Sequence, residues 1–286
     1  MFIERDGGRL FSTTLGTGPD VVLLHPTPVH HAFWLPVAER LASDFRVTLV
    51  DLRGHGQSTS GAGPITMGRL AEDLHAVLQS MEVIQAALVG CSIGGYLLYE
   101  YWRRFPGEVA GLVPVCGKPQ ADTATNREKR NETMRTARQP NGLGRIFDLM
   151  TDTLIAPTAQ QRNPELRKIA RAMMNDVSLD AFLAVQEGLM ERPDSVPTLA
   201  TVRVPVCVVA GGEDQVSSPD EMRVIAEEVQ GTEFHLLPDA GHYAPLEQPE
   251  KIACILQAFF KRVASQSSAT PAAKSNSQKS TTGPVH

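Results

Sequence analysis

The sequence predicts an α/β protein: a doubly wound, mostly parallel sheet with an inserted helical cap. Three observations support this fold class. Short runs rich in β-branched residues recur along the 286-residue chain, amphipathic helical patterns separate them, and one long stretch carries helical patterns alone. Alternating strands and helices are typical of a parallel sheet that helices cover on both faces.

Apolar runs bounded by turn residues are the expected strands. Their continuous hydrophobicity suits strands that are buried on both faces. In chain order they are DVVLLH (20–25), FRVTLVDL (45–52), AALVG (86–90), GLVPVC (111–116), VPVCVVAG (204–211) and EFHLLP (233–238).

Helical periodicity occupies the segments 66–81 and 249–264, where apolar residues fall on one stripe. Thr66 is the expected N-cap of the first helix, because its hydroxyl can accept a hydrogen bond from a free N–H of the first turn. The stripes consist of Leu70, Leu74, Val77, Leu78 and Met81 in the first helix and of Ile252, Ile255, Phe259 and Val263 in the second.

Residues 118–200 break the alternation, since they contain helical stretches such as RIFDLMTDTLIA and LDAFLAVQEGLM but no convincing strand. A bare loop of this length would be improbable inside a compact domain. We therefore expect a core formed by residues 1–117 and 201–264, with residues 118–200 as a helical cap. The Ser-, Thr-, Pro- and Lys-rich tail at 265–286 is expected to be disordered.

Composition narrows the classes of function. The chain is 42% hydrophobic and 21% charged, with a net charge of −5, so it offers no basic field for nucleic acid. It has no apolar run of membrane-spanning length, no secretory signal pattern and no C-x-x-C pair. Neither zinc spacing nor a glycine-rich nucleotide loop occurs. We expect a cytoplasmic protein with no cofactor, no metal, no membrane association and no nucleic-acid partner.

The stretch GCSIG, residues 90–94, fits the pattern G-x-S-x-G with Ser92 at its centre. A strand that runs directly into a helix lifts the central side chain above the sheet edge, and the flanking positions must be small so that the two elements can pack closely. Cys91 stands one position too early for the exposed apex, so we interpret it as a packed side chain beside a nucleophilic Ser92.

Two further residues supply an acid and a base. Asp214 follows the strand at 204–211, and His242 follows the strand at 233–238. Parallel sheets gather their sites at the carboxyl ends of strands, and Ser, Asp and His occur here in the order of an α/β-hydrolase triad. Glu213 is a rival acid, but its position in GGEDQV favours Asp214.

On these motifs the sequence resembles the α/β-hydrolase family over residues 1 to about 264. The stretches VDLRGHGQS (50–58), GCSIG, GGEDQVSSP (211–219) and LPDAGHYAPLEQPEKI (237–252) stand where that family has its landmarks. Within the family, GCSIGGYLLYEYWRRFP and the short cap look closest to carboxylic ester hydrolases of the 3-oxoadipate enol-lactonase type.

The resemblance implies an oxyanion hole formed by the backbone N–H groups of Thr27 and Ile93. The family usually has His-Gly at this loop, whereas this chain has His25-Pro26. Proline has no N–H, but the implied donor belongs to the next residue. What this chain loses is the conformational freedom of the glycine.

The expected function is hydrolysis of a small carboxylic ester or lactone through an acyl-serine, with Ser92, Asp214 and His242 as the catalytic residues. The same triad also serves carbon–carbon bond hydrolases, thioesterases, acyltransferases and cofactor-free haloperoxidases. A non-catalytic ligand receptor on this scaffold is a further alternative, which turnover would exclude.

An enclosed, mostly apolar chamber that favours short acyl groups is expected between cap and core. Its expected lining residues are Phe33, Trp34, Leu149, Phe182 and Met190.

Overall fold

The computed structural model describes residues 1–269, and residues 270–286 lie outside this range. Within it, eight strands form one sheet in the order β1-β2-β4-β3-β5-β6-β7-β8. The six apolar runs form β3 (Asp20–Leu24), β4 (Arg46–Val50), β5 (Ala86–Cys91), β6 (Val109–Val115), β7 (Cys207–Gly211) and β8 (Glu233–Leu237). All of these six pair in parallel. The predicted α/β fold class is confirmed.

The sheet also has two antiparallel strands that the sequence analysis did not predict, β1 (Phe2–Arg5) and β2 (Gly8–Leu15). They form a hairpin, and β2 joins the sheet through antiparallel pairing with β4. Buried and exposed positions alternate along the first half of β2, and residues 12–14 are Ser and Thr. A search for continuous apolar runs therefore passes over this edge of the sheet.

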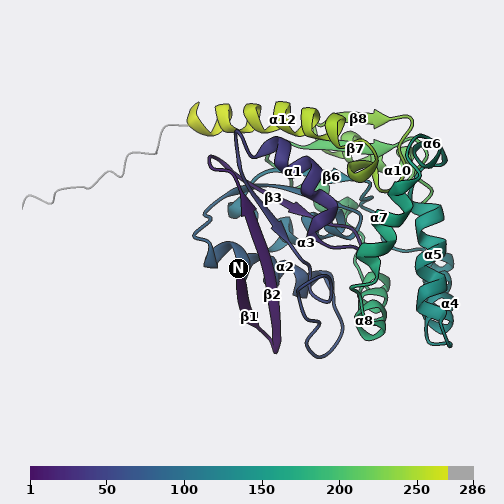
Figure 1. Ribbon diagram of the computed structural model, residues 1–286. Coiled ribbons are helices and arrows are strands. Elements are labelled where there is room, and N and C mark those ends of the chain that lie inside the picture. Colours follow the sequence, from purple (N-terminus) through teal and green to yellow (C-terminus); the bar gives the residue numbers. More distant parts are fainter. Residues whose placement is uncertain (270–286) are drawn as a thin grey trace, which may run out of the picture.

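Alternate residues of the parallel strands serve two separate cores. Val21 and Leu23 of β3 pack in the cluster that contains α1 (Leu35–Leu41) and α12 (Pro249–Ala269). Val22 and Leu24 pack in the other cluster, which contains α2 (Met67–Ser80), α3 (Ile93–Arg104) and α10 (Pro219–Glu228). The period of two along a strand thus places helices on both faces of the sheet (Figure 1).

Two predicted helices occur close to their predicted positions. Thr66 caps α2, because its hydroxyl accepts a hydrogen bond from the Arg69 N–H. The helix α12 begins at Pro249 and runs to Ala269, so it passes the boundary expected at residue 264. The rest of the tail expected to be disordered, residues 270–286, lies outside the described residues.

Residues 118–200, all of which the structure describes, contain helices and no strand. These helices gather on the side of the sheet toward which β8 points (Figure 1). They are α4 (Ala124–Ala137), α5 (Gly142–Leu154), α6 (Pro157–Arg162), α7 (Glu165–Met174), α8 (Leu179–Met190) and α9 (Val196–Leu199). Short helical turns elsewhere are η1 (His31–Trp34), η2 (Pro106–Glu108) and α11 (Ala244–Glu247). Among the described helices, none has both the length and the apolar character needed to span a bilayer.

Candidate active site

Ser92 lies at the junction of β5 and α3, in a backbone conformation that non-glycine residues rarely adopt. Its φ is +53°, and the residue is 6% exposed. A Cβ atom at Gly90 would overlap the Gly94 carbonyl oxygen, and one at Gly94 would approach the Leu24 carbonyl oxygen of β3. Glycine is therefore required at both flanking positions, because only then can strand and helix meet in a turn this sharp.

Cys91 is fully buried, and its thiol donates a hydrogen bond to the His242 carbonyl oxygen over 3.5 Å. Burial, together with the negative charge of Asp214, raises the pKa of the Cys91 thiol well above its ordinary value. Because the thiolate is the nucleophilic form of cysteine, this environment favours a packing role for Cys91.

His242 and Asp214 are paired at the carboxyl ends of β8 and β7. The His242 Nδ1 donates to Asp214 Oδ2 over 2.9 Å, and both side chains are buried. The other Asp214 oxygen accepts from the backbone N–H groups of Val216 and Ser217. Burial alone would raise the pKa of Asp214, but the charge of His242 and these hydrogen bonds hold it below its ordinary value. The paired Nδ1 leaves the lone pair of Nε2 free to accept a proton.

Ser92 and His242 line the same cavity. Within the described part of the chain, no hydrogen bond joins the Ser92 hydroxyl to the imidazole. Such bonds are often long in free enzymes and tighten when substrate is present.

Glu213, the rival acid, has a different partner. Its carboxylate accepts a hydrogen bond from the backbone N–H of Thr158 in α6 over 3.2 Å. It therefore ties α6 to the loop after β7, and the histidine bond belongs to Asp214.

Thr27 follows β3 and lines the cavity beside Ser92. Within residues 1–269, the backbone N–H groups of Thr27 and Ile93 donate to no protein acceptor. Ile93 is the first residue of α3, where N–H groups have no partner inside the helix. Thr27 is held from two sides, because its hydroxyl bonds His55 Nε2 over 2.9 Å and its carbonyl accepts from the Tyr243 hydroxyl over 3.3 Å.

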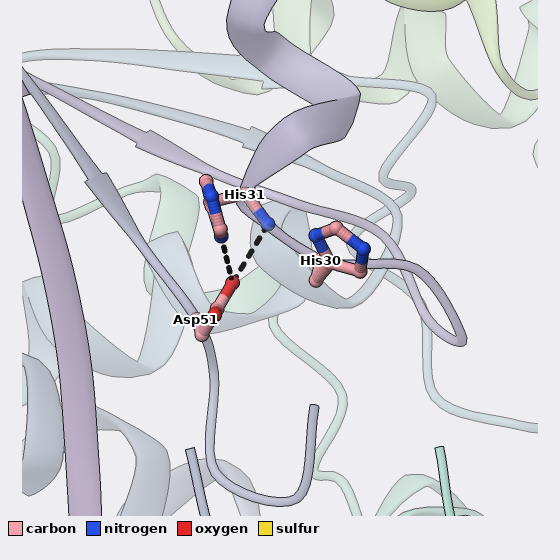
Figure 2. A group of neighbouring side chains, drawn as sticks. All are labelled: His30, His31 and Asp51. Atoms are coloured by element: carbon pink, nitrogen blue, oxygen red, sulfur yellow. Dashed lines mark hydrogen bonds and ion pairs between the residues drawn. The ribbon is translucent and has the colours of Figure 1, made fainter. Parts of the chain in front are cut away.

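A buried carboxylate anchors the loop that carries Thr27. Figure 2 shows Asp51 facing His31, and Asp51 Oδ1 accepts from both the His31 backbone N–H and Nδ1, over 2.7 and 2.8 Å. Its Oδ2 accepts from the Gln57 N–H. Burial raises the pKa of Asp51, but these bonds outweigh burial and lower it to about 2. His30, close by, instead accepts from the Ala32 N–H at the start of η1.

Two more histidines lie under this loop and are neutral at physiological pH. Burial lowers the pKa of His25 to about 3 and that of His55 to about 4. His25 accepts from the Leu52 N–H through Nε2, and His55 contacts the Arg53 carbonyl oxygen through Nδ1. Because His25 reaches Leu52 and the Nε2 of His55 bonds the Thr27 hydroxyl, both rings join the 25–31 loop to the 51–58 loop.

The cavity above Ser92 has a volume of about 540 Å³, which is within the usual range for small-molecule sites. Of the expected lining residues, Leu149 and Phe182 border it. The expectation is wrong for Phe33 and Trp34, which are fully buried in the core with the Phe33 ring against Tyr243. It is also wrong for Met190, because its neighbour Leu189 occupies the lining position and successive helix residues point about 100° apart.

Charged residues line part of the cavity beside its apolar residues. Its wall includes the ion pairs Lys118–Glu221, at 2.6 Å, and Arg130–Asp122, at 2.5 Å. Asp122 also binds Arg192. Sequence reasoning missed these residues, because they come from α4, α10 and two loops and form no local motif.

The fold and this geometry define an α/β hydrolase, and the comparison with known families agrees. The model of the alpha/beta hydrolase family matches residues 21–253. The chain belongs to this family.

Relatives and solved structures with similar folds include esterases and lactonases. The chain is 24% identical to 3-oxoadipate enol-lactonase 1 of Acinetobacter baylyi, over 92% of this chain and 97% of that protein. It is 27% identical to the pimeloyl-[acyl-carrier protein] methyl ester esterase of Nitrosospira multiformis, over 88% of this chain and 98% of that protein. A thermophilic esterase from Thermogutta terrifontis superposes with a TM-score of 0.85 at 31% identity, covering 90% and 94% of the two chains.

Proposed function

We propose that this protein is a serine hydrolase that cleaves small carboxylic esters or lactones through an acyl-serine intermediate. The observation that carries the proposal is the buried His242–Asp214 pair on the same cavity as Ser92, which stands at the apex of a strained turn. The esterase and lactonase names among its relatives support the choice of an ester bond.

In the proposed reaction, His242 Nε2 takes the hydroxyl proton of Ser92 as Oγ attacks the carbonyl carbon. Asp214 holds the ring in the tautomer that frees Nε2 and stabilises the imidazolium. The N–H groups of Thr27 and Ile93 receive the oxyanion. His242 then protonates the leaving alkoxide, and a water molecule, activated by the same nitrogen, hydrolyses the acyl-serine.

Labelling of the nucleophile tests this proposal. The wild-type protein and the variant Cys91→Ala should react with a fluorophosphonate probe and hydrolyse p-nitrophenyl acetate. Ser92→Ala should lose labelling, and its kcat should fall by roughly 10⁵- to 10⁶-fold, because a triad without its nucleophile retains little beyond binding and the oxyanion hole.

Two outcomes would contradict the proposal. Loss of activity in a folded Cys91→Ala with Ser92→Ala still active would move the nucleophile to the cysteine. A wild-type protein that binds esters without turning them over would be a receptor on this scaffold.

A further inference from the structure

Glu247 is a buried carboxylate that the proposed reaction does not use. It ends the short helix α11, directly after the His242 loop, and is 9% exposed. Burial raises the pKa of Glu247 to about 7. Because a carboxyl group is costly to bury unless hydrogen bonds compensate for lost water, its partners indicate why it is there.

Its two oxygens accept hydrogen bonds from three backbone N–H groups. Oε2 accepts from Gly241 over 2.8 Å and from Ala156 over 3.2 Å. Oε1 accepts from Tyr243 over 3.1 Å. Gly241 and Tyr243 flank His242 on both sides, whereas Ala156 belongs to the connection between α5 and α6.

The two segments that Glu247 joins are also in direct backbone contact. The Tyr243 N–H, which Glu247 Oε1 shares, also donates to the Leu154 carbonyl oxygen over 3.0 Å. A Cβ atom at Gly241 would lie 2.6 Å from the Ala156 nitrogen, so only glycine permits this approach. The backbone around the imidazole therefore rests on residues 154–156, far away in the sequence.

We propose that Glu247 is a positioning residue whose carboxylate fastens the backbone on both sides of His242 to residues 154–156 and so fixes the imidazole relative to Ser92. The role in turnover rests on the proposed function, but the role in holding the ring does not. Displacement of a reacting group by about 1 Å can cost about 10²-fold in rate, so loosening this clamp should reduce catalysis with the fold intact.

The variant Glu247→Gln tests the proposal. The amide keeps one acceptor oxygen and turns an N–H₂ group toward at least one backbone donor, so the clamp cannot form completely. At pH 8.5, where the Glu247 carboxyl group is ionised, we expect kcat for p-nitrophenyl acetate to fall by about 10- to 100-fold with little change in KM. The matched control is Glu250→Gln. Glu250 is exposed in the first turn of α12 and pairs with Arg40 of α1, so this variant should behave as wild type.

A second readout does not depend on turnover. The proton that His242 Nδ1 donates to Asp214 should give a low-field NMR signal, and its exchange with water should be faster in Glu247→Gln. If the wild-type protein had no esterase activity but Glu247→Gln still accelerated this exchange, the positioning role would hold and the proposed function would be wrong. A folded Glu247→Gln with wild-type kcat and exchange would overturn the positioning role.

Ala156→Pro keeps the test decisive if Glu247→Gln does not fold. Ala156 has φ −54° and ψ 137°, which proline adopts without strain, and the preceding Ile155 is extended. The substitution removes the N–H on the far side of the clamp, and the proline Cδ takes the direction of that N–H, so it pushes the Glu247 carboxylate away from residue 156 without altering Glu247 itself. Slower turnover and faster exchange would support the proposal, and wild-type values would overturn it.

Discussion

At the scale of single residues, neighbours in the sequence have different partners because the backbone turns between them. Glu213 and Asp214 are adjacent acids, yet one accepts from the Thr158 N–H and the other from His242 Nδ1. The same contrast separates Cys91, whose thiol points to the His242 carbonyl oxygen, from Ser92, which borders the cavity. A sequence motif places both residues of such a pair at the site, and only their hydrogen bonds show which of the two contacts His242 or the cavity.

Substitution of the two acids measures this difference. Asp214→Asn should lower kcat on the order of 10⁴-fold with the fold retained, because an amide favours the wrong imidazole tautomer and cannot stabilise the imidazolium. Glu213→Gln should change kcat little, since its amide oxygen can still accept from Thr158. The measurement is kcat for p-nitrophenyl acetate, with circular dichroism as the folding control. Equal losses in both variants would refute the assignment of the acid.

At the scale of elements, continuous apolar runs were a sound guide to β3–β7, because these strands are buried on both faces. The run also located β8, although this edge strand is mostly half-buried. Apolar runs failed at β1, which has no buried residue, and at β2, where buried positions alternate with more exposed ones and residues 12–14 are Ser and Thr. The helical pattern also predicted α5 and α8 close to their observed ends. It could not place Phe33 and Trp34, because an aromatic pair after a loop is equally suited to a pocket and to a core.

The 25–31 and 51–58 loops form one unit that should lose stability in acid. Burial lowers the pKa of both His25 and His55 from the ordinary value of 6.5, to about 3 and about 4. The unfolded chain therefore binds more protons than the folded chain as pH falls below 6.5, which lowers the free energy of unfolding. Each histidine should contribute a loss of roughly 2 kcal/mol between pH 7.5 and 5.

Urea unfolding of wild type and His55→Gln at pH 7.5 and pH 5.0 tests this expectation. The variant should be less stable at pH 7.5, because it loses the bonds of the ring to Thr27 and Arg53. Its further loss on acidification should be smaller than that of wild type by about 2 kcal/mol. An identical loss in the two proteins would mean that His55 does not remain neutral in the fold.

At the scale of the whole molecule, the candidate site joins parts of the chain that are far apart in sequence. Ser92, Asp214 and His242 could be proposed from the sequence, because each follows an apolar run that predicts a strand end. The charged part of the cavity wall could not, because Asp122 and Arg130 meet each other and Arg192 only when the helices of residues 118–200 are packed together. Glu247 carried no sequence signal for its role either, since its donors are backbone groups of two distant segments.

The cavity formed by these parts should favour short acyl groups. Its volume of about 540 Å³ suits a compact substrate. A long acyl chain that fills the cavity would contact not only its apolar lining but also the Lys118–Glu221 and Arg130–Asp122 pairs. Covering charged pairs with methylene groups removes water from them without providing new partners, which is unfavourable.

We therefore expect kcat/KM for p-nitrophenyl esters to be highest between acetate and butyrate and to decline toward palmitate, without activation by lipid droplets. Leu149 is the one large apolar side chain among these lining residues that is strongly exposed, at 59%. If kcat/KM were instead highest for palmitate, the chain would have to leave past Leu149, and Leu149→Glu should then abolish the long-chain preference.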